Sequence, residues 1–198
     1  MMRIDLFGRI LGSKTRSDYQ LAHDALYNRL MAGTVDKNGR FVWSGGEFRA
    51  ALGKGGLIPA DKKREGDGAS PIGAWPLRRV LYRPDRVPPP ATALPVAALE
   101  PAMGWCDDPK DPNYNCPVSH PYPSSAEHLW RADELYDVIV VLGHNEDPIV
   151  PGAGSAIFLH CAKPGFPPTE GCIALQRDDL LTLLASAIPG DALIISGE

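Results

Sequence analysis

The residue types best suited to covalent chemistry lie in one segment, from His160 to Cys172, with the sequence HCAKPGFPPTEGC. His160 ends an apolar run, and Cys172 follows Gly171 directly before a second apolar run. A cysteine is nucleophilic as its thiolate, which an adjacent imidazole favours by lowering the thiol pKa. A glycine before the cysteine allows a tight turn, so that backbone N–H groups can face a developing oxyanion. The segment therefore predicts nucleophilic catalysis by a Cys172–His160 pair, with Gly171 in the oxyanion-binding turn.

Two other interpretations use the same segment. Free cysteine is among the most buried residue types, so Cys172 beside Ile-Ala-Leu is also typical of a core position. A zinc site would take His160, Cys161 and Cys172 as ligands, with Cys106 as a further candidate, but this spacing matches no common zinc pattern. Cys161 also alternates to the opposite side of the strand from His160. We therefore expect no metal, and the core interpretation of Cys172 stays open.

Length and composition indicate one globular domain. The chain has 198 residues, of which 44% are hydrophobic and 22% charged, and this balance excludes a disordered protein. It contains 20 glycines and 20 prolines, about a fifth of the chain, which favours many turns and a β-rich fold. The net charge of −4 argues against a nucleic-acid partner. Four cysteines are too few for a disulfide scaffold.

The sequence offers no segment for crossing a membrane. It has no run of 18 apolar residues, the length that a membrane-spanning helix needs. The first 16 residues, MMRIDLFGRILGSKTR, interrupt their apolar stretch with Asp5, Gly8 and Arg9. They therefore lack the apolar core of a standard secretory signal peptide.

The elements before the prolines are a helix and several strands. Residues 17–30 carry a capping-box pattern and an apolar face, which predict a helix. Two β-prone runs, 34–35 and 40–43, flank an Asn-Gly turn and predict a hairpin. Residues 47–52 and 74–82 predict two further strands.

The following segment, 83–123, contains eleven prolines, too many for regular strands or helices. Its aromatic residues favour an ordered, packed loop over a flexible linker. After it, residues 136–142 and 156–161 are apolar and rich in β-branched or aromatic side chains, so they predict buried strands that lead to His160. Residues 178–188 predict a helix with acidic residues at its start, and residues 192–196 a last strand.

The segment that ends at Cys172 resembles the active-site signature of the L,D-transpeptidase catalytic domain family, which remodels bacterial peptidoglycan. The signature is a His at the end of a strand, a variable loop, then Ser or Thr, one residue, Gly and Cys. It maps here to His160, Thr169, Glu170, Gly171 and Cys172. Further stretches that resemble the family or one branch of it are GKGG (53–56), KREGDG (63–68), SPIG (70–73), YRPDR (82–86), GWCDD (104–108) and GSAIFLH (154–160).

The resemblance covers roughly residues 34–198 and implies a fold. We expect a mainly β protein: a single L,D-transpeptidase-like β-sandwich domain over 34–198, with one or two helices and a long Pro-rich loop at 83–123. Residues 1–33 lie outside the resemblance and are expected to form a helical N-terminal extension.

The resemblance also implies an activity. Cys172 would attack the carbonyl of an L-configured residue in a peptidoglycan stem peptide, and His160 would take the thiol proton and later assist the incoming amine. The backbone N–H groups of Gly171 and Cys172 would form the oxyanion hole. A diaminopimelate side-chain amine of a neighbouring stem would resolve the acyl-enzyme and form a cross-link, with no metal or organic cofactor. Such a substrate implies the cell envelope or periplasm.

Five residues are predicted around the substrate. Thr169 belongs to the signature, where it braces the turn before the cysteine. Arg64 and Arg83 lie in family-like stretches, and residues 61–86 carry seven basic and four acidic side chains, which suits a carboxylate-bearing substrate. Trp105 is a candidate pocket wall and His144 a candidate partner behind the catalytic pair. For each of them a surface, turn or packing role is the alternative.

Two departures from the family pattern concern the donor. Glu170 stands where typical members have a His, and Ala174 stands where they have an Arg expected to hold a substrate carboxylate. The missing Arg is compatible with members of this branch thought to use a first-position L-alanine carbonyl. Two alternative functions stay open: an L,D-carboxypeptidase or endopeptidase that hydrolyses stem peptides, and a non-catalytic wall-binding module.

Overall fold

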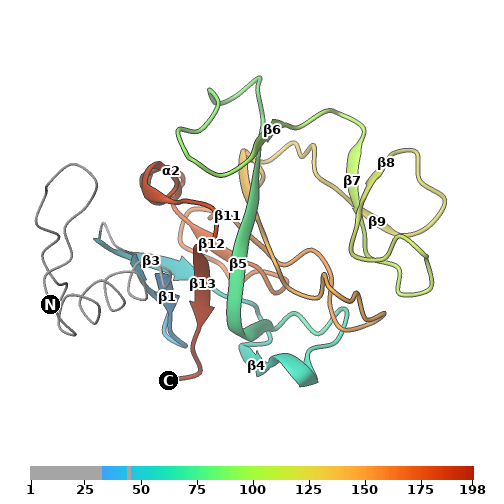
Figure 1. The fold of residues 1–198 in the computed structure, drawn as a ribbon, viewed down its shortest axis with the longest axis horizontal. Coiled ribbons are helices and arrows are strands. Elements are labelled where there is room, and N and C mark those ends of the chain that lie inside the picture. The colour runs from blue at the N-terminus through green and yellow to red at the C-terminus, as the bar shows by residue number, and fades with distance from the viewer. Residues whose placement is uncertain (1–32, 44–45) are drawn as a thin grey trace, which may run out of the picture. The chain divides into compact units, whose positions relative to one another are not determined.

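The computed structural model describes residues 33–43 and 46–198 (Figure 1). This part of the chain is mainly β, as predicted, and contains one α-helix, α2 (Arg177–Ser186). The helix predicted over 17–30 lies outside the described residues. Within the described ranges, no helix is both long and apolar enough to span a membrane. The strands are β1 (Gly33–Val35), β2 (Arg40–Trp43), β3 (Gly46–Ala51), β4 (Leu57–Pro59), β5 (Ser70–Tyr82), β6 (Val96–Ala98), β7 (Met103–Cys106), β8 (Pro117–Ser119), β9 (Ala126–His128), β10 (Val138–Leu142), β11 (Phe158–Cys161), β12 (Ile173–Leu175) and β13 (Ala192–Ile195).

The main sheet closes on itself through the long strand β5, which runs through the centre of Figure 1. Its strands pair in the order β10-β11-β12-β3-β2-β1-β13-β5, and β5 pairs again with β10. The first part of β5 pairs with β13 and the later part with β10, so the two sheets of the predicted sandwich share this strand. Pro76 lies at the changeover, where its missing N–H suits a break in the ladder.

Most predicted strands are confirmed, with shifted ends. The predicted hairpin is β1 and β2, which pair antiparallel across the Asn-Gly turn. The strand predicted over 74–82 begins earlier, at Ser70, because its first residues pair in parallel with β4. Pro71 and Gly73 interrupt the alternation there, so the sequence carries little strand signal.

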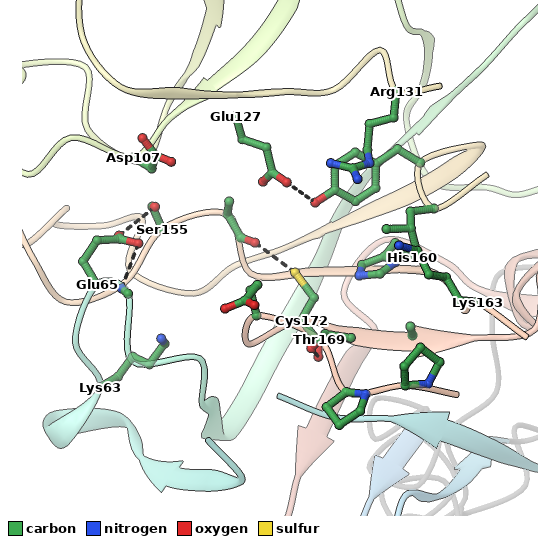
Figure 2. Close-up of a pocket in the computed structure, with 18 residues that line it drawn as sticks. Lys63, Glu65, Asp107, Glu127, Arg131, Ser155, His160, Lys163, Thr169 and Cys172 are labelled. Atoms are coloured by element: carbon green, nitrogen blue, oxygen red, sulfur yellow. Dashed lines mark hydrogen bonds between the residues drawn. The ribbon is translucent and has the colours of Figure 1, made fainter. Parts of the chain in front are cut away.

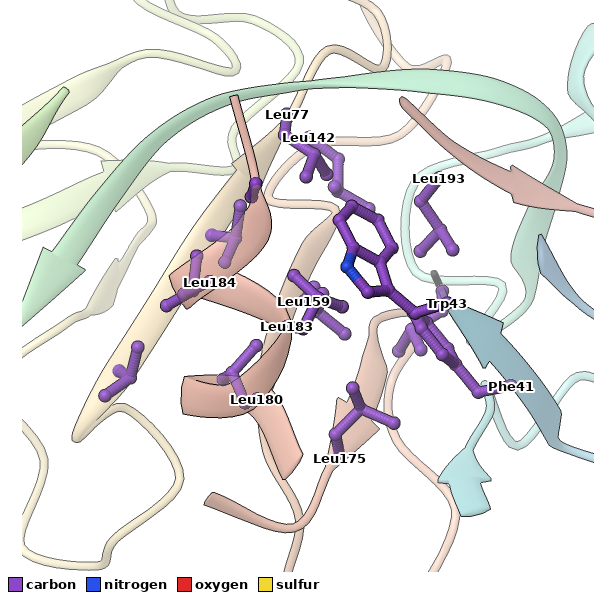
Figure 3. Close-up of a cluster of buried hydrophobic side chains, with 14 of the residues drawn as sticks. Phe41, Trp43, Leu77, Leu142, Leu159, Leu175, Leu180, Leu183, Leu184 and Leu193 are labelled. Atoms are coloured by element: carbon purple, nitrogen blue, oxygen red, sulfur yellow. The ribbon is translucent and has the colours of Figure 1, made fainter. Parts of the chain in front are cut away.

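The main hydrophobic core lies between this sheet and α2 (Figure 3). Leu180, Leu183 and Leu184 are fully buried and lie on one face of the helix, at the spacing expected of an amphipathic helix. Figure 3 shows them near Leu159 of β11. The helix ends before the predicted residue 188, because Ile188 precedes Pro189 and a residue in that position is disfavoured in a helix.

The connection between β5 and β10, residues 83–137, is called here the β5–β10 connection. It is ordered and packed, as predicted, but the expectation that its prolines exclude regular strands was wrong. It contains β6 and a separate three-stranded sheet in the order β8-β7-β9. The prolines are compatible with this sheet because Pro117 begins an edge strand, and Pro121 and Pro123 lie between strands.

The packing of α2 generates the first prediction. Leu183→Ala removes a fully buried side chain and leaves a cavity, so we expect it to lower the free energy of unfolding by about 2–5 kcal/mol in a denaturant titration. Val150→Ala is the control, since Val150 is 51% exposed and its truncation is expected to change stability by less than about 0.5 kcal/mol. Equal effects of the two substitutions would contradict the placement of α2 on the core.

Candidate active site

A cavity of about 580 Å³ contains both residues of the predicted catalytic pair (Figure 2). Its lining comes from the loop before β5, from the β5–β10 connection, and from β11 and the loop that joins β11 to β12. Cys172 and His160 lie on adjacent parts of this lining, and Figure 2 shows a ring nitrogen of His160 directed toward the Cys172 sulfur.

The parallel pairing of β11 with β12 brings these two side chains together. His160 lies opposite Ala174 in the register, and Cys172 directly precedes β12. The N–H of Phe158 donates to the Cys172 sulfur at 3.4 Å, so the thiol lies level with Phe158. His160 is two residues further along β11 and therefore projects from the same face of the strand.

Cys161 projects to the other side of β11. Its side chain belongs to the main core and its thiol donates to the carbonyl oxygen of Val138 at 3.8 Å, whereas Cys172 packs in a second cluster of buried residues. His160 and Cys161 therefore do not converge on a common metal site. Among residues 33–43 and 46–198, no group of three or more His, Cys, Asp or Glu side chains is arranged to hold a metal ion.

Burial keeps both members of the pair neutral. Desolvation raises the pKa of Cys172 to about 12, and the nearby charge of Glu127 adds to this effect. Desolvation lowers the pKa of His160 to about 4. The sequence analysis expected the imidazole to favour a thiolate; burial acts against that effect, and the Cys172 sulfur lies 3.1 Å from the carbonyl oxygen of Ala156, to which a thiol can donate. The spacing of residues did not reveal this burial.

The hydrogen bond of His160 selects its tautomer. Its Nδ1 lies 2.9 Å from the carbonyl oxygen of Cys161, and a carbonyl oxygen can only accept. Nδ1 therefore carries the proton, and Nε2 has a free lone pair. The Tyr136 ring packs edge-on against the imidazole, with ring centroids 5.3 Å apart. The arrangement suits a neutral general base.

The turn before Cys172 is held by Thr169. The Thr169 hydroxyl donates to the carbonyl oxygen of Cys172 at 2.6 Å and accepts from the N–H of Gly171 at 3.2 Å. Gly171 has φ +129°, and a Cβ there would lie 2.9 Å from the carbonyl oxygen of Ala69, so only glycine fits. The Gly171 N–H is thus already engaged, and the Cys172 N–H, which has no partner among the described residues, is the freer oxyanion donor.

Two family-like stretches support this turn from outside. The N–H of Thr169 donates to the carbonyl oxygen of Leu52, and the N–H of Lys54 donates back to the carbonyl oxygen of Thr169. The Ser70 hydroxyl accepts from the N–H of Gly53 at 2.9 Å and donates to the carbonyl oxygen of Cys172 at 3.4 Å. The GKGG and SPIG stretches therefore position the cysteine without reaching the cavity.

Asn115 fixes Ala156, whose carbonyl oxygen accepts the hydrogen bond from the Cys172 thiol. Ala156 has φ +51°, an unfavourable value for a residue with a side chain. The Asn115 Oδ1 accepts from the N–H of Ala156 at 3.0 Å and from the Trp105 indole at 2.9 Å. Its amide nitrogen donates to the carbonyl oxygens of His144 and Asn145. Asn115 thus uses its full hydrogen-bonding capacity to join the β5–β10 connection to the segment before β11.

Each cationic side chain of the cavity lining is paired with a carboxylate. Lys63, which is buried, pairs with Asp67. Arg131 donates to both oxygens of Asp133 at 2.8 Å, and Lys163 lies 3.6 Å from the same carboxylate. Figure 2 shows Arg131 and Lys163 on the same side of the cavity as His160.

Two of the predicted substrate contacts lie elsewhere. Arg64 is exposed and outside the cavity lining, where its guanidinium donates to backbone carbonyl oxygens of Asp61 and Lys63. Arg83 is 4% exposed, pairs with Asp85 and donates to the carbonyl oxygen of Arg131. Arg83 itself does not line the cavity, but its hydrogen bond fixes the backbone of Arg131, which does.

Trp105 and His144 line a different cavity, of about 330 Å³. Trp105 packs edge-on against Phe158 of β11, with ring centroids 5.1 Å apart, in the cluster of buried residues that includes Cys172. His144 is buried, and its Nε2 lies 3.0 Å from the carbonyl oxygen of Ala153. Neither side chain lines the cavity of Cys172, so we assign both to the support of the site.

The sequence analysis missed most of the polar lining. Glu65 lies within the family-like KREGDG stretch, which was a usable signal, but the neighbouring Arg64 was chosen instead. Asp107 lies in the family-like GWCDD stretch but was not among the predicted substrate contacts. Glu127 comes from a three-residue strand that carries no chemical signature in the sequence.

A sequence model of the YkuD family, described as the L,D-transpeptidase catalytic domain, matches residues 29–195. The chain belongs to the L,D-transpeptidase catalytic domain family. This match agrees with the family resemblance found in the sequence, and it includes every residue of the cavity lining.

Solved L,D-transpeptidases are similar over most of this chain. An L,D-transpeptidase from Mycobacterium smegmatis has 14% identity and a TM-score of 0.40, covering 84% of this chain and 58% of its own. L,D-transpeptidase 3 from Mycobacterium tuberculosis, in complex with a faropenem-derived adduct, has 15% identity and a TM-score of 0.41, covering 85% and 60%. This chain thus spans about three fifths of the length of these structures. None of the curated proteins compared with the chain matches it.

The raised pKa of Cys172 predicts how its alkylation depends on pH. A thiol is protonated below its pKa, so at pH 7 little thiolate is present, and we expect the iodoacetamide reaction to rise by about tenfold per pH unit from pH 7 to pH 10. Peptide mapping by mass spectrometry measures the rate, and Cys172→Ala corrects for the other thiols. A rate that is already constant below pH 8 would instead mean a preformed thiolate–imidazolium pair.

The hydrogen bonds of Asn115 predict a second effect. Asn115→Ala leaves two buried carbonyls and the Ala156 N–H without partners, so we expect the free energy of unfolding to fall by about 3 kcal/mol. The pH profile of Cys172 alkylation is also expected to shift, because the Ala156 carbonyl oxygen is no longer fixed as the acceptor of the thiol hydrogen bond. Asn113→Ala, an exposed residue of the same turn, is the control. A change in stability with an unaltered alkylation profile would show that Asn115 only supports the fold.

Proposed function

We propose that this protein is an L,D-transpeptidase that forms peptidoglycan cross-links through an acyl-enzyme on Cys172. The observation that carries the proposal is the shared cavity: the Cys172 thiol and a free Nε2 of His160 lie in one space of about 580 Å³. Membership of the L,D-transpeptidase catalytic domain family supports the choice of substrate class. The substrate places the enzyme's work in the cell envelope.

The first step is acylation by the donor stem. The Cys172 proton moves to Nε2 of His160 as the sulfur attacks the carbonyl carbon that links an L-residue to the next residue. The Cys172 N–H stabilises the oxyanion of the tetrahedral intermediate. Collapse breaks the C–N bond, His160 returns the proton to the leaving amine, and the L-residue remains as a thioester on Cys172.

The second step transfers the acyl group to an amine. The neutral side-chain amine of a neighbouring diaminopimelate residue attacks the thioester carbon and gives one proton to His160. Collapse expels the Cys172 sulfur, which takes that proton back, and a new amide bond joins the two stems. No redox change or external energy source is needed, because one amide bond replaces another.

The neutral resting state is compatible with this chemistry. A buried thiol and imidazole cost less to hold in a desolvated cavity than the corresponding ion pair. Charge then develops only when the donor carbonyl is present to share it and the oxyanion donor is in place. We propose a first-position L-alanine as the donor residue. Typical family members have an arginine, expected to hold a substrate carboxylate, at the position of Ala174, and Ala174 lies opposite His160 in the strand register.

The decisive experiment compares products from purified tetrapeptide and pentapeptide muropeptides. We expect cross-linked dimers with the wild type, none with Cys172→Ala, and a rate about 10²–10⁴-fold lower with His160→Gln. Cys116→Ser, a thiol outside this cavity, is the matched control and is expected to retain activity.

Other products would redirect the proposal. Shortened stems without dimers would indicate a carboxypeptidase or endopeptidase, in which water resolves the thioester. Binding of muropeptides without an acyl-enzyme, checked by intact mass, would indicate a wall-binding module and overturn the catalytic role of Cys172.

A further inference from the structure

The cavity of Cys172 holds an excess of unpaired negative charge. Its three cations lie within ion-pair distance of two aspartates, Lys63 of Asp67 and both Arg131 and Lys163 of Asp133. Glu170, which also lines the cavity, pairs with Lys54. By contrast, Glu65, Asp107 and Glu127 line the same cavity, and none of them has a cationic partner within 4.0 Å among the described residues. These three carboxylates are called here the acidic wall. A ligand that fills the cavity and carries a positive charge would balance the charge of these carboxylates.

Glu65 is built into the wall by two hydroxyl groups. Its Oε2 accepts from the Tyr114 hydroxyl at 2.5 Å and from the Ser155 hydroxyl at 2.7 Å. Tyr114 is buried, and burial, followed by its hydrogen bond to Glu65, raises the pKa of its phenol. The two hydroxyl donors hold the Glu65 carboxylate in one orientation, so it is not a free surface side chain.

The other two carboxylates come from the β5–β10 connection. The Oε1 of Glu127 accepts from the Tyr136 hydroxyl at 2.7 Å, which leaves Oε2 without a partner among the described residues. The Oδ1 of Asp107 is inaccessible to solvent and has no hydrogen-bond partner. Figure 2 shows Asp107 and Glu65 across the cavity from His160 and Lys163, with Cys172 between the two sides.

An independent observation indicates that a ligand fills this space. His160 is 4% exposed and lines the cavity, and its Nδ1 lies 2.9 Å from the carbonyl oxygen of Cys161. Its Nε2 therefore faces the cavity as an unpartnered acceptor in a buried side chain. A donor that reaches both Nε2 and a carboxylate of the acidic wall would carry an N–H group with positive charge, which describes a protonated amine.

We propose that the acidic wall is the subsite for the protonated amine of the acyl acceptor, with Glu127 as its main contact. The inference rests on the acyl transfer proposed above and deepens it, since it names the group that the cavity selects for the second step. The wall raises the local concentration of the ammonium form and orients its nitrogen toward the thioester on Cys172. Neutral acceptors and water gain no ion pair from these carboxylates.

The acidic wall can also accept the proton that the ammonium must lose before its nitrogen attacks. The bound ammonium gives one proton to Glu127, and the neutral nitrogen then has the lone pair that attacks the thioester carbon. The second proton passes to His160 and returns to the Cys172 sulfur when the thioester breaks, and Glu127 releases its proton to solvent. Burial raises the pKa of Glu127 and so favours its role as a temporary proton acceptor.

A binding experiment that needs no turnover tests the subsite. The probe is a purified stem tripeptide with a free side-chain amine, and its matched control is the same tripeptide with that amine acetylated. Titration calorimetry on Cys172→Ala protein is expected to give at least about tenfold tighter binding of the free amine, the effect of one charge-assisted hydrogen bond. Glu127→Gln in the same background is expected to remove this difference, and Glu134→Gln, an exposed carboxylate outside the cavity, is expected to leave it unchanged.

Kinetics then separates the subsite from the proposed function. With active enzyme and a donor stem alone, Glu127→Gln is expected to form the acyl-enzyme at least as fast as the wild type, by intact mass. With the acceptor present, its ratio of dimer to hydrolysed product is expected to fall about tenfold. Equal affinity for the free and acetylated tripeptides would overturn the subsite, even if dimers form. Tighter binding of the free amine without any acyl-enzyme would uphold the subsite and overturn the transpeptidase proposal.

Discussion

The parallel pairing of β11 with β12, with His160 opposite Ala174, determines which side chains meet in the cavity. Successive residues of a strand project to opposite faces, so a shift by one residue would turn His160 into the main core and Cys161 toward the cavity. The register is held from both sides of the strand pair. Cys161 and Leu159 belong to the core beneath α2, and Phe158 packs against Trp105 on the cavity side. The catalytic geometry is therefore a consequence of core packing.

The same packing explains what the sequence could and could not predict. Apolar runs identified β10 and β11, and alternation along β11 correctly separated His160 from Cys161. The closure of the sheet through β5 was not visible, because pairing on both edges of a strand depends on distant partners. The burial of Cys172, which raises its pKa, could not be predicted either, since spacing indicates which groups meet but not how completely neighbours from other segments remove water from them. That burial is supplied by residues from the β5–β10 connection and β11 together.

The sequence also could not predict which charged side chains of one loop face the cavity. Lys63, Arg64 and Glu65 are consecutive, yet Lys63 is buried in an ion pair, Arg64 is exposed and Glu65 faces the cavity. The family-like stretch indicated the right loop but not which side chain turns inward. In an irregular loop no period relates sequence position to direction, so only the tertiary partners Tyr114 and Ser155 define the role of Glu65.

The β5–β10 connection contacts both the proposed nucleophile and the proposed acceptor subsite. Through Asn115 it holds Ala156, whose carbonyl oxygen receives the thiol, and through Asp107 and Glu127 it supplies two carboxylates of the acidic wall. The reacting pair itself lies on the sheet, whose register tolerates little change. A connection between strands tolerates substitution far better than the strands do. In the proposed transpeptidase, acceptor selectivity would therefore vary through the connection without a change on β11 and β12, provided that Asn115 keeps its four hydrogen bonds.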